Sequence, residues 1–200
     1  MAVCDRSGRG EQRRQQVLDA AEQCFRRSGF RGASMAEISE AAGMSTGHIY
    51  HYFKSKEAIV EAIVERQQER GLDIIHGVTA ADDVLAALVE SAAAGLETVT
   101  RVNDPVLAME IHAEAARNPV VGTIVKECDR KIGGSLRELL QAGQRQGSIQ
   151  SETDADALAT MLDAVFVGLI ARAAITPDFD YDKVLAALRL LLDRYLRPLP

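Results

Sequence analysis

The positions of the prolines and the spacing of the apolar residues constrain this fold more than any other feature. All five prolines stand at positions 105, 119, 177, 198 and 200, so none falls between residues 1 and 104 or between 120 and 176. Asp104-Pro105 and Asn118-Pro119 each have the form of a helix-capping residue followed by proline in the first turn. The prolines therefore indicate where helices begin, and they interrupt none.

Apolar residues recur at helical intervals along the chain. Two examples are the series Leu85, Leu88, Val89, Ala92, Leu96 and Val99, and the series Val121, Val125, Cys128, Ile132, Leu136 and Leu139. No segment shows the sustained alternation of a half-buried strand, so we expect an all-α chain. The predicted helices cover residues 11–28, 35–42, 45–51, 55–76, 82–102, 105–117, 119–146, 154–174 and 181–196.

Composition is that of a globular protein, because 47% of the residues are apolar and 26% are charged. The longest uninterrupted apolar run, residues 164–171, is far shorter than the roughly 18 residues of a membrane-spanning helix. Residues 1–10 contain two arginines but no apolar segment behind them, so we expect no secretory signal. These observations predict a cytoplasmic protein with no membrane partner.

The three cysteines, Cys4, Cys24 and Cys128, are too few and too widely spaced for a disulfide framework or a zinc site. Cys24 and Cys128 fall on apolar helical stripes, where a thiol acts as a small core residue. A redox switch is the alternative.

Charge is unevenly distributed along the chain. Residues 1–56 hold nine basic and six acidic side chains, whereas the chain as a whole carries a net charge of −6. A basic N-terminal segment therefore precedes an acidic body.

The most informative segment runs from residue 34 to residue 62. Ser34 and Glu37 form a capping-box pattern, and Gly43 is suited to end the short helix that follows. Ser45 is then placed to cap a second helix. Two helices joined by a short glycine-containing turn are typical of the helix-turn-helix, whose second helix enters the DNA major groove.

The second helix of this pair has one apolar face, formed by Ile49 and Phe53. Its remaining residues are unusually aromatic for a surface. Gly47 has no side chain and lets the backbone approach a partner closely, at a helix-propensity cost of about 1 kcal/mol relative to alanine.

The segment resembles the TetR family of bacterial transcriptional regulators. The resemblance rests on residues 17–63 and is carried by Val17, Ala20, Ala21, Phe25, Gly29-Phe30, Ser34-Met35, Ile38, the turn 42–45, Gly47, Ile49-Tyr50, Tyr52-Phe53 and Ser55-Lys56-Glu57. A weaker resemblance covers residues 110–196. Together, the two resemblances imply a DNA-binding domain at 11–56 behind a flexible basic tail at 1–10, and a helical effector-binding and dimerisation domain at 57–200.

The resemblance also implies DNA-binding roles. The residues expected at base edges, phosphates or sugars are Ser34, Met35, Ser45, Thr46, Gly47, His48, Tyr50, His51, Tyr52 and Lys56. Lys56, behind the capping residue Ser55, puts an ammonium and free backbone N–H groups where a phosphate can sit. The alternatives are a solvated charge at Lys56, a half-buried core ring at Tyr52, and plain surface residues at His48 and His51.

The last two predicted helices are apolar around much of their circumference. Such faces on a small domain need a cover, so we predict a twofold dimer that reads a palindromic operator in double-stranded DNA. The predicted interface residues are Leu158, Leu162, Val165, Leu169, Leu188, Leu191, Leu192 and Tyr195.

The resemblance implies an effector cavity in the body of each subunit. Small residues such as Ala92 and Gly95 leave room for an apolar or amphipathic molecule that releases the DNA. The candidate lining residues and polar contacts are Met109, Glu110, His112, Met161, Phe166 and Arg172.

Two other functions were compared with this one. A metal-dependent enzyme built on Glu110, His112 and Glu114 is not expected, because alternate helical residues point about 200° apart and cannot converge on one ion. We expect no catalytic activity, cofactor or metal. A DNA-binding regulator or activator without an effector remains the alternative.

Overall fold

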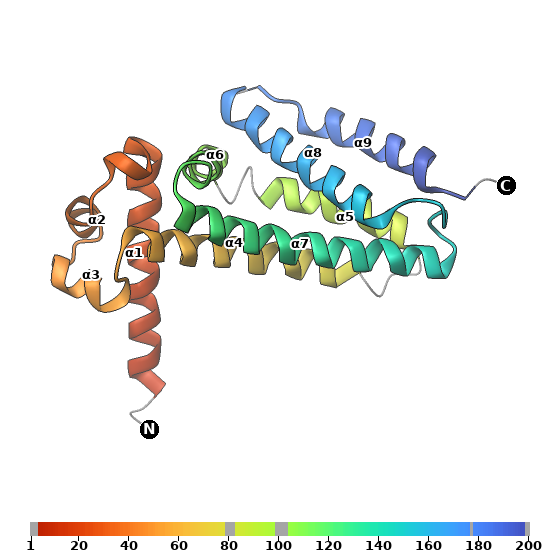
Figure 1. Cartoon of the computed structure of the whole chain (residues 1–200). Helices are drawn as coiled ribbons and strands as arrows, with labels where there is room; N and C mark the ends of the chain where they lie inside the picture. Colours follow the sequence, from red (N-terminus) through yellow and green to blue (C-terminus); the bar gives the residue numbers. More distant parts are fainter. Residues whose placement is uncertain (1–3, 79–82, 99–103, 177, 199–200) are drawn as a thin grey trace. The chain divides into compact units, whose positions relative to one another are not determined.

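The computed structural model describes residues 4–78, 83–98, 104–176 and 178–198. Within these ranges the chain forms nine α-helices and no strand (Figure 1). The helices are α1 Cys4–Gly32, α2 Met35–Ala41, α3 Thr46–Tyr52, α4 Lys56–Val78, α5 Val84–Glu97, α6 Pro105–Ala115, α7 Pro119–Gln146, α8 Ala155–Ile175 and α9 Tyr181–Leu196. The all-α prediction is confirmed. Most helix ends agree with the predicted ends to within two residues, and the predicted end of α5 lies outside the described residues.

The first helix differs most from its prediction. It begins at Cys4, so residues 4–10, which the sequence assigned to a flexible tail, are helical. Its regular part ends near the predicted residue 28, because Gly29 adopts a non-helical conformation with φ 67° and ψ 170°. The early start has a simple cause. The glycines at 8 and 10 lower helix propensity by only about 1 kcal/mol each, and no proline stops the helix.

The chain divides into two compact units. Unit 1 comprises residues 1–66 and 106–125, and unit 2 comprises residues 67–105 and 126–200. In unit 1 the fully buried side chains include Phe25, Ile38, Ile49, Ile59 and Ile63. These residues come from four helices, α1 to α4, so that α2 and α3 pack on a shared apolar core.

Unit 2 has its own core. It contains Ile75, Val84, Leu85, Leu88, Leu139, Leu140, Ile149, Ala155, Leu158, Ala159, Leu192 and Leu196. Cys128 lies half-buried on α7, and burial raises the pKa of its thiol to about 11. Burial also raises the pKa of the Cys24 thiol in unit 1. Because the thiolate is the reactive form, these environments favour the packing role over the redox role.

The α8 helix carries more apolar surface than unit 2 covers. By length and composition it is the one described helix apolar enough to cross a membrane, yet only 17% of its most apolar window is buried. The expectation that no apolar segment is long enough to cross a membrane is wrong for α8. That expectation rested on uninterrupted apolar runs, whereas α8 is apolar on average along its length and contains only a few charged residues. A core helix of a soluble protein passes the same test. Its exposed apolar face requires a cover.

A glycine near the start of α7 allows a close helix approach within unit 1. A Cβ atom at Gly122 would lie 2.8 Å from the backbone oxygen of Ala115 at the end of α6. We expect Gly122→Ala to destabilise unit 1 by about 1–3 kcal/mol, as overpacking does elsewhere. Thermal or denaturant unfolding measures the change. Gly133→Ala on the same helix is the matched control, since a Cβ there meets nothing within 4 Å and alanine favours the helix. Equal stabilities of the two variants would contradict the close approach.

Candidate nucleic-acid interface

Two hydrogen-bonded caps begin the α2 and α3 helices. The Glu37 backbone N–H donates to Ser34 Oγ over 3.2 Å, and the Ser34 N–H donates to Glu37 Oε2 over 2.7 Å. The predicted capping box is therefore present. The Ser34 backbone hydrogen bond, followed by the Ser34 hydroxyl, lowers the pKa of the Glu37 carboxyl. Ser45 caps α3 in the same way, accepting from the His48 N–H over 3.3 Å.

The turn between α2 and α3 is tight and braced. Gly43 has φ 61°, a left-handed conformation that glycine adopts without steric cost. Beneath the turn, Ser39 Oγ and Thr46 Oγ1 are 3.0 Å apart and share a hydrogen bond. From α1, the Gln16 side chain donates to the Ala42 carbonyl over 2.7 Å. The helix pair is therefore held at its turn by polar contacts and at its base by the apolar core.

The α3 helix anchors on Ile49 and exposes most of its other residues. Ile49 and the following Phe53 are 0% and 3% exposed, as their spacing predicted. Gly47, His48, Tyr50 and His51 are exposed, and Thr46 and Tyr52 are half-buried. Of the other predicted DNA contacts, Ser34 and Ser45 are exposed, and Met35 and Lys56 are half-buried. The predicted set thus gathers on α2, α3 and the first turn of α4 in unit 1.

Lys56 has an internal role that the sequence did not indicate. Its Nζ donates to the carbonyl oxygens of Phe30 and Ala33, both over 2.7 Å, and lies 4.5 Å from the centre of the Phe30 ring. These carbonyls belong to the end of α1 and the segment leading to α2. Two of the three N–H groups of the Lys56 ammonium therefore donate hydrogen bonds inside unit 1. This weakens the prediction that the ammonium contacts a phosphate.

Lys54 is a further basic side chain beside α3 that the predicted DNA contacts did not include. Its side chain is exposed, and its Nζ donates to the Tyr50 carbonyl at the end of α3 over 2.9 Å. The sequence signal for it was a second basic residue next to the helix-turn-helix.

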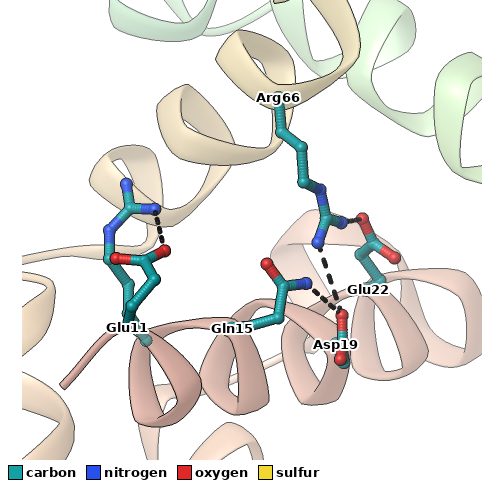
Figure 2. Close-up of polar contacts among 6 residues, drawn as sticks. Glu11, Gln15, Asp19, Glu22 and Arg66 are labelled. Atoms are coloured by element: carbon teal, nitrogen blue, oxygen red, sulfur yellow. Dashed lines mark hydrogen bonds and ion pairs between the residues drawn. The ribbon is translucent and has the colours of Figure 1, made fainter. Parts of the chain in front are cut away.

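An ionic cluster joins α1 to α4 within unit 1. Arg66 of α4 points toward α1, where its guanidinium contacts Asp19 at 3.4 Å and hydrogen-bonds Glu22 (Figure 2). Gln15 donates to the same Asp19 over 2.7 Å. Arg14 of α1 lies 5.2 Å from the centre of the Phe53 ring. These contacts hold α1 against the helix-turn-helix and its following helix.

The predicted effector residues divide between the two units. In unit 1, Glu110 lies beside Gly29, and the His112 ring Nδ1 is 2.8 Å from the Ala108 carbonyl. Met109 is half-buried. The neighbouring Glu114 is buried and faces Arg31 at 3.4 Å, so these acidic and imidazole groups do not converge. Within the described residues no group of three His, Cys, Asp or Glu is placed to hold a metal ion.

The effector residues on α8 in unit 2 differ in exposure. Phe166 is half-buried against Gly95 of α5, where a Cβ atom would lie 3.4 Å from its ring. Met161 is 50% exposed and Arg172 is also exposed, so neither lines the interior of the subunit. We therefore remove these two residues from the proposed cavity lining.

The predicted dimer residues also divide. Val165, Leu191 and Tyr195 are 36%, 66% and 58% exposed. Leu162, Leu169 and Leu188 are half-buried. Leu158 and Leu192 are 4% and 3% exposed, because they belong to the core of unit 2. A side chain already covered inside the subunit has no surface left for a partner, so these two leave the proposed interface.

Two family models match the chain. Residues 17–63 match the model for bacterial regulatory proteins of the tetR family, and residues 81–197 match the C-terminal model of the BetI-type transcriptional repressor. The chain belongs to the TetR family. The match to residues 17–63 covers the capped helix pair described above. This TetR-family protein is therefore a DNA-binding transcriptional regulator and not an enzyme.

Similar proteins span most of this TetR-family chain. The HTH-type transcriptional regulator UidR of Escherichia coli K12 is 30% identical over 79% of this chain and 80% of its own length. The HTH-type transcriptional repressor AcnR of Corynebacterium glutamicum is 26% identical over 80% of this chain and 81% of its own. The structure of Salmonella enterica GusR has a TM-score of 0.79 and 34% identity, covering 92% of this chain and 95% of that one.

Proposed function

We propose that this protein is a repressor that binds a palindromic operator as a homodimer through α3 and is released by a small apolar or amphipathic molecule. The observation that carries the DNA-binding part is α3 itself. Its apolar side is buried in unit 1, its N-terminus is capped by Ser45, and His48, Tyr50 and His51 stand exposed on it. A short helix held this way is suited to enter a major groove. Such a regulator acts where the DNA is, in the cytoplasm.

The proposed DNA contacts follow from this arrangement. Thr46, Gly47, His48 and His51 face base edges, and Ser34, Met35, Tyr50 and Ser45 approach the backbone from α2 and α3. We add Lys54 to the phosphate contacts, because its ammonium is exposed. Lys56 contributes mainly by holding α1 in place. The proposal also includes the division between a DNA-binding domain that ends at residue 56 and an effector-binding and dimerisation domain at 57–200, with residues 4–10 now part of α1.

The homodimer part rests on the exposed apolar surface of α8 and α9. Met161 and Val165 on α8 and Leu191 and Tyr195 on α9 leave a third or more of their surface open. The structure adds Leu190, which is 51% exposed. A second copy of the chain is the occupant that a twofold operator requires. The charged residues Asp163 and Arg172 on α8 make membrane lipid an unfavourable cover for this surface, since charges inside a bilayer are costly.

The effector part rests on unit 2 and on the family. Gly95 on α5 faces α8, where a Cβ atom would lie 3.4 Å from the Phe166 ring, and the small residue Ala92 is half-buried on the same helix. Met109, Glu110 and His112 lie on α6 in unit 1, and their effector role stays a prediction from the family resemblance. An effector changes operator occupancy tenfold by preferring the non-binding state by about 1.4 kcal/mol. B. subtilis FadR, a structural neighbour with a TM-score of 0.78, was solved with stearoyl-CoA, an amphipathic molecule.

The test begins with selection of DNA by the purified protein from a random-sequence pool. We expect an enriched palindrome. His48→Ala changes the enriched sequence, because a base-edge contact contributes about 1–3 kcal/mol of discrimination. His76→Ala, the same change at an exposed histidine at the end of α4, leaves it unchanged. No enrichment, or the same palindrome from His48→Ala, would overturn the assignment of α3.

The effector is tested by titrating the operator complex with a panel of hydrophobic metabolites, with thermal shift in parallel. Release of DNA by a compound that also raises the melting temperature supports the repressor proposal. Stabilisation without release indicates a co-repressor, and no response across the panel favours the effector-independent regulator.

A further inference from the structure

The α3 helix lacks every side chain that most commonly reads a base pair. Its sequence, TGHIYHY, contains no Arg or Lys to pair with guanine, no Asn or Gln for adenine and no Asp or Glu for cytosine. The Thr46 hydroxyl is already engaged with Ser39 at 3.0 Å. The polar groups left to read bases are therefore imidazoles and phenols.

Two of these rings are arranged around a third. The His48 ring stacks on the Tyr52 ring, with centres 5.4 Å apart and planes inclined by 24°. The His51 ring meets the same Tyr52 edge-on, with centres also 5.4 Å apart. Tyr52 is half-buried and both imidazoles are exposed. We call these three residues the ring cluster. Tyr52 therefore limits the orientations of both histidines before any DNA arrives.

The imidazoles are available for an outside partner. Neither His48 nor His51 has a side-chain hydrogen bond among the described residues, and both offer at least one ring N–H. In a major groove, guanine presents two adjacent acceptors, N7 and O6, whereas adenine presents an acceptor beside a donor. An N–H donor in the negative potential of DNA is favoured over an acceptor, so guanine suits the imidazoles best.

We propose that the ring cluster is the specificity element of this protein: His48 and His51 donate to guanine N7 edges, and Tyr52 is a positioning residue that orients both imidazoles. This inference rests on the proposed DNA-binding function and names its target chemistry. It assigns Tyr52 a role through its ring, in place of the phosphate contact expected of its hydroxyl. Tyr50, which lies outside the cluster and is 43% exposed, keeps the backbone role.

The first test alters the DNA. Each guanine of the selected operator is replaced in turn by 7-deazaguanine, which lacks the N7 acceptor, and the dissociation constant is measured by fluorescence anisotropy. We expect at least one of these substitutions in each half-site to weaken binding by the wild-type protein about tenfold. The same substitution causes no further loss of affinity in the variant that lacks the contacting histidine, either His48→Ala or His51→Ala. Replacing adenine by 7-deazaadenine leaves binding unchanged. Full tolerance of 7-deazaguanine, or sensitivity at adenine alone, would overturn the inference while leaving operator binding established.

The second test alters Tyr52. Tyr52→Phe keeps the ring and removes the hydroxyl, so we expect operator affinity within about twofold of wild type and unchanged sensitivity to 7-deazaguanine. Tyr52→Leu removes the ring, and we expect about tenfold weaker binding with the sensitivity lost. Thermal unfolding of both variants separates a folding defect from a reading defect. A large loss in Tyr52→Phe would instead assign the hydroxyl to a phosphate. Wild-type sensitivity retained in a folded Tyr52→Leu would remove the positioning role.

Discussion

The double substitution Leu191→Glu and Tyr195→Glu on α9 is expected to convert the homodimer into a monomer and to weaken operator binding at least about 100-fold, equivalent to about 2.7 kcal/mol. The two side chains are 66% and 58% exposed and stand one helical turn apart. In the proposed dimer they meet the partner's apolar surface, where an unpaired carboxylate is costly to bury. A monomer holds one half-site at a time and loses the benefit of two linked contacts.

Light scattering and sedimentation measure the mass of each variant, and anisotropy measures its affinity for the operator. Arg189→Glu is the matched control, because it makes the same change of −2 in net charge at an exposed position of α9, about 100° or more around the helix from Leu190, Leu191 and Tyr195. We expect Arg189→Glu to remain dimeric and to bind DNA as the wild type does. A monomeric wild-type protein at micromolar concentration, or a doubly substituted protein that stays dimeric, contradicts the proposed interface.

Lys56→Met is expected to lower the stability of unit 1 by about 3 kcal/mol, because two charge-assisted hydrogen bonds are lost and hydrogen bonds to charged groups contribute about 1.5–3 kcal/mol each. The substitution leaves the carbonyls of Phe30 and Ala33 without the ammonium that both now accept from. Methionine keeps much of the apolar stem, so the loss reports on the charge and its hydrogen bonds. A loss of this size is large beside the 5–15 kcal/mol that stabilises a typical domain.

Lys54→Met is the comparison variant, because we expect it to weaken DNA binding with little change in stability. Its ammonium is exposed and donates to one carbonyl, so we expect a change in stability below about 1 kcal/mol. Its loss removes a proposed phosphate contact, which weakens binding to all sequences alike and reduces the salt dependence. Chemical denaturation and salt titration of DNA binding therefore separate the two lysines. The internal role of Lys56 is refuted if Lys56→Met unfolds like the wild type.

Residues near one another in the sequence were the easiest to interpret. Ser34 and Glu37, Gly43, and Ser45 predicted the helix, turn and second helix, and each makes the local contact expected of it. Capping and turn geometry depend on a few neighbouring residues, so the sequence contains the whole cause. The buried face of α3, with Ile49 and Phe53, followed from helical spacing for the same reason.

Other features depended on residues far apart in the chain. Lys56 bonds to carbonyls 23 and 26 residues away, and no local pattern distinguishes it from a solvated lysine. Leu158 and Leu191 are equally apolar in sequence, yet one is 4% and the other 66% exposed. The stripe that a helix presents is periodic, but the part of that stripe covered by its own subunit depends on which helices pack against it.

By itself, the sequence determined the all-α class, the order and approximate limits of the helices, and the capped helix pair that marks a DNA-binding regulator. Only the tertiary structure decided that the Lys56 ammonium serves the end of α1 and which apolar residues of α8 and α9 remain open. Helices and caps arise from interactions within a few residues. The availability of a side chain for a partner depends on every neighbour that folding brings to it.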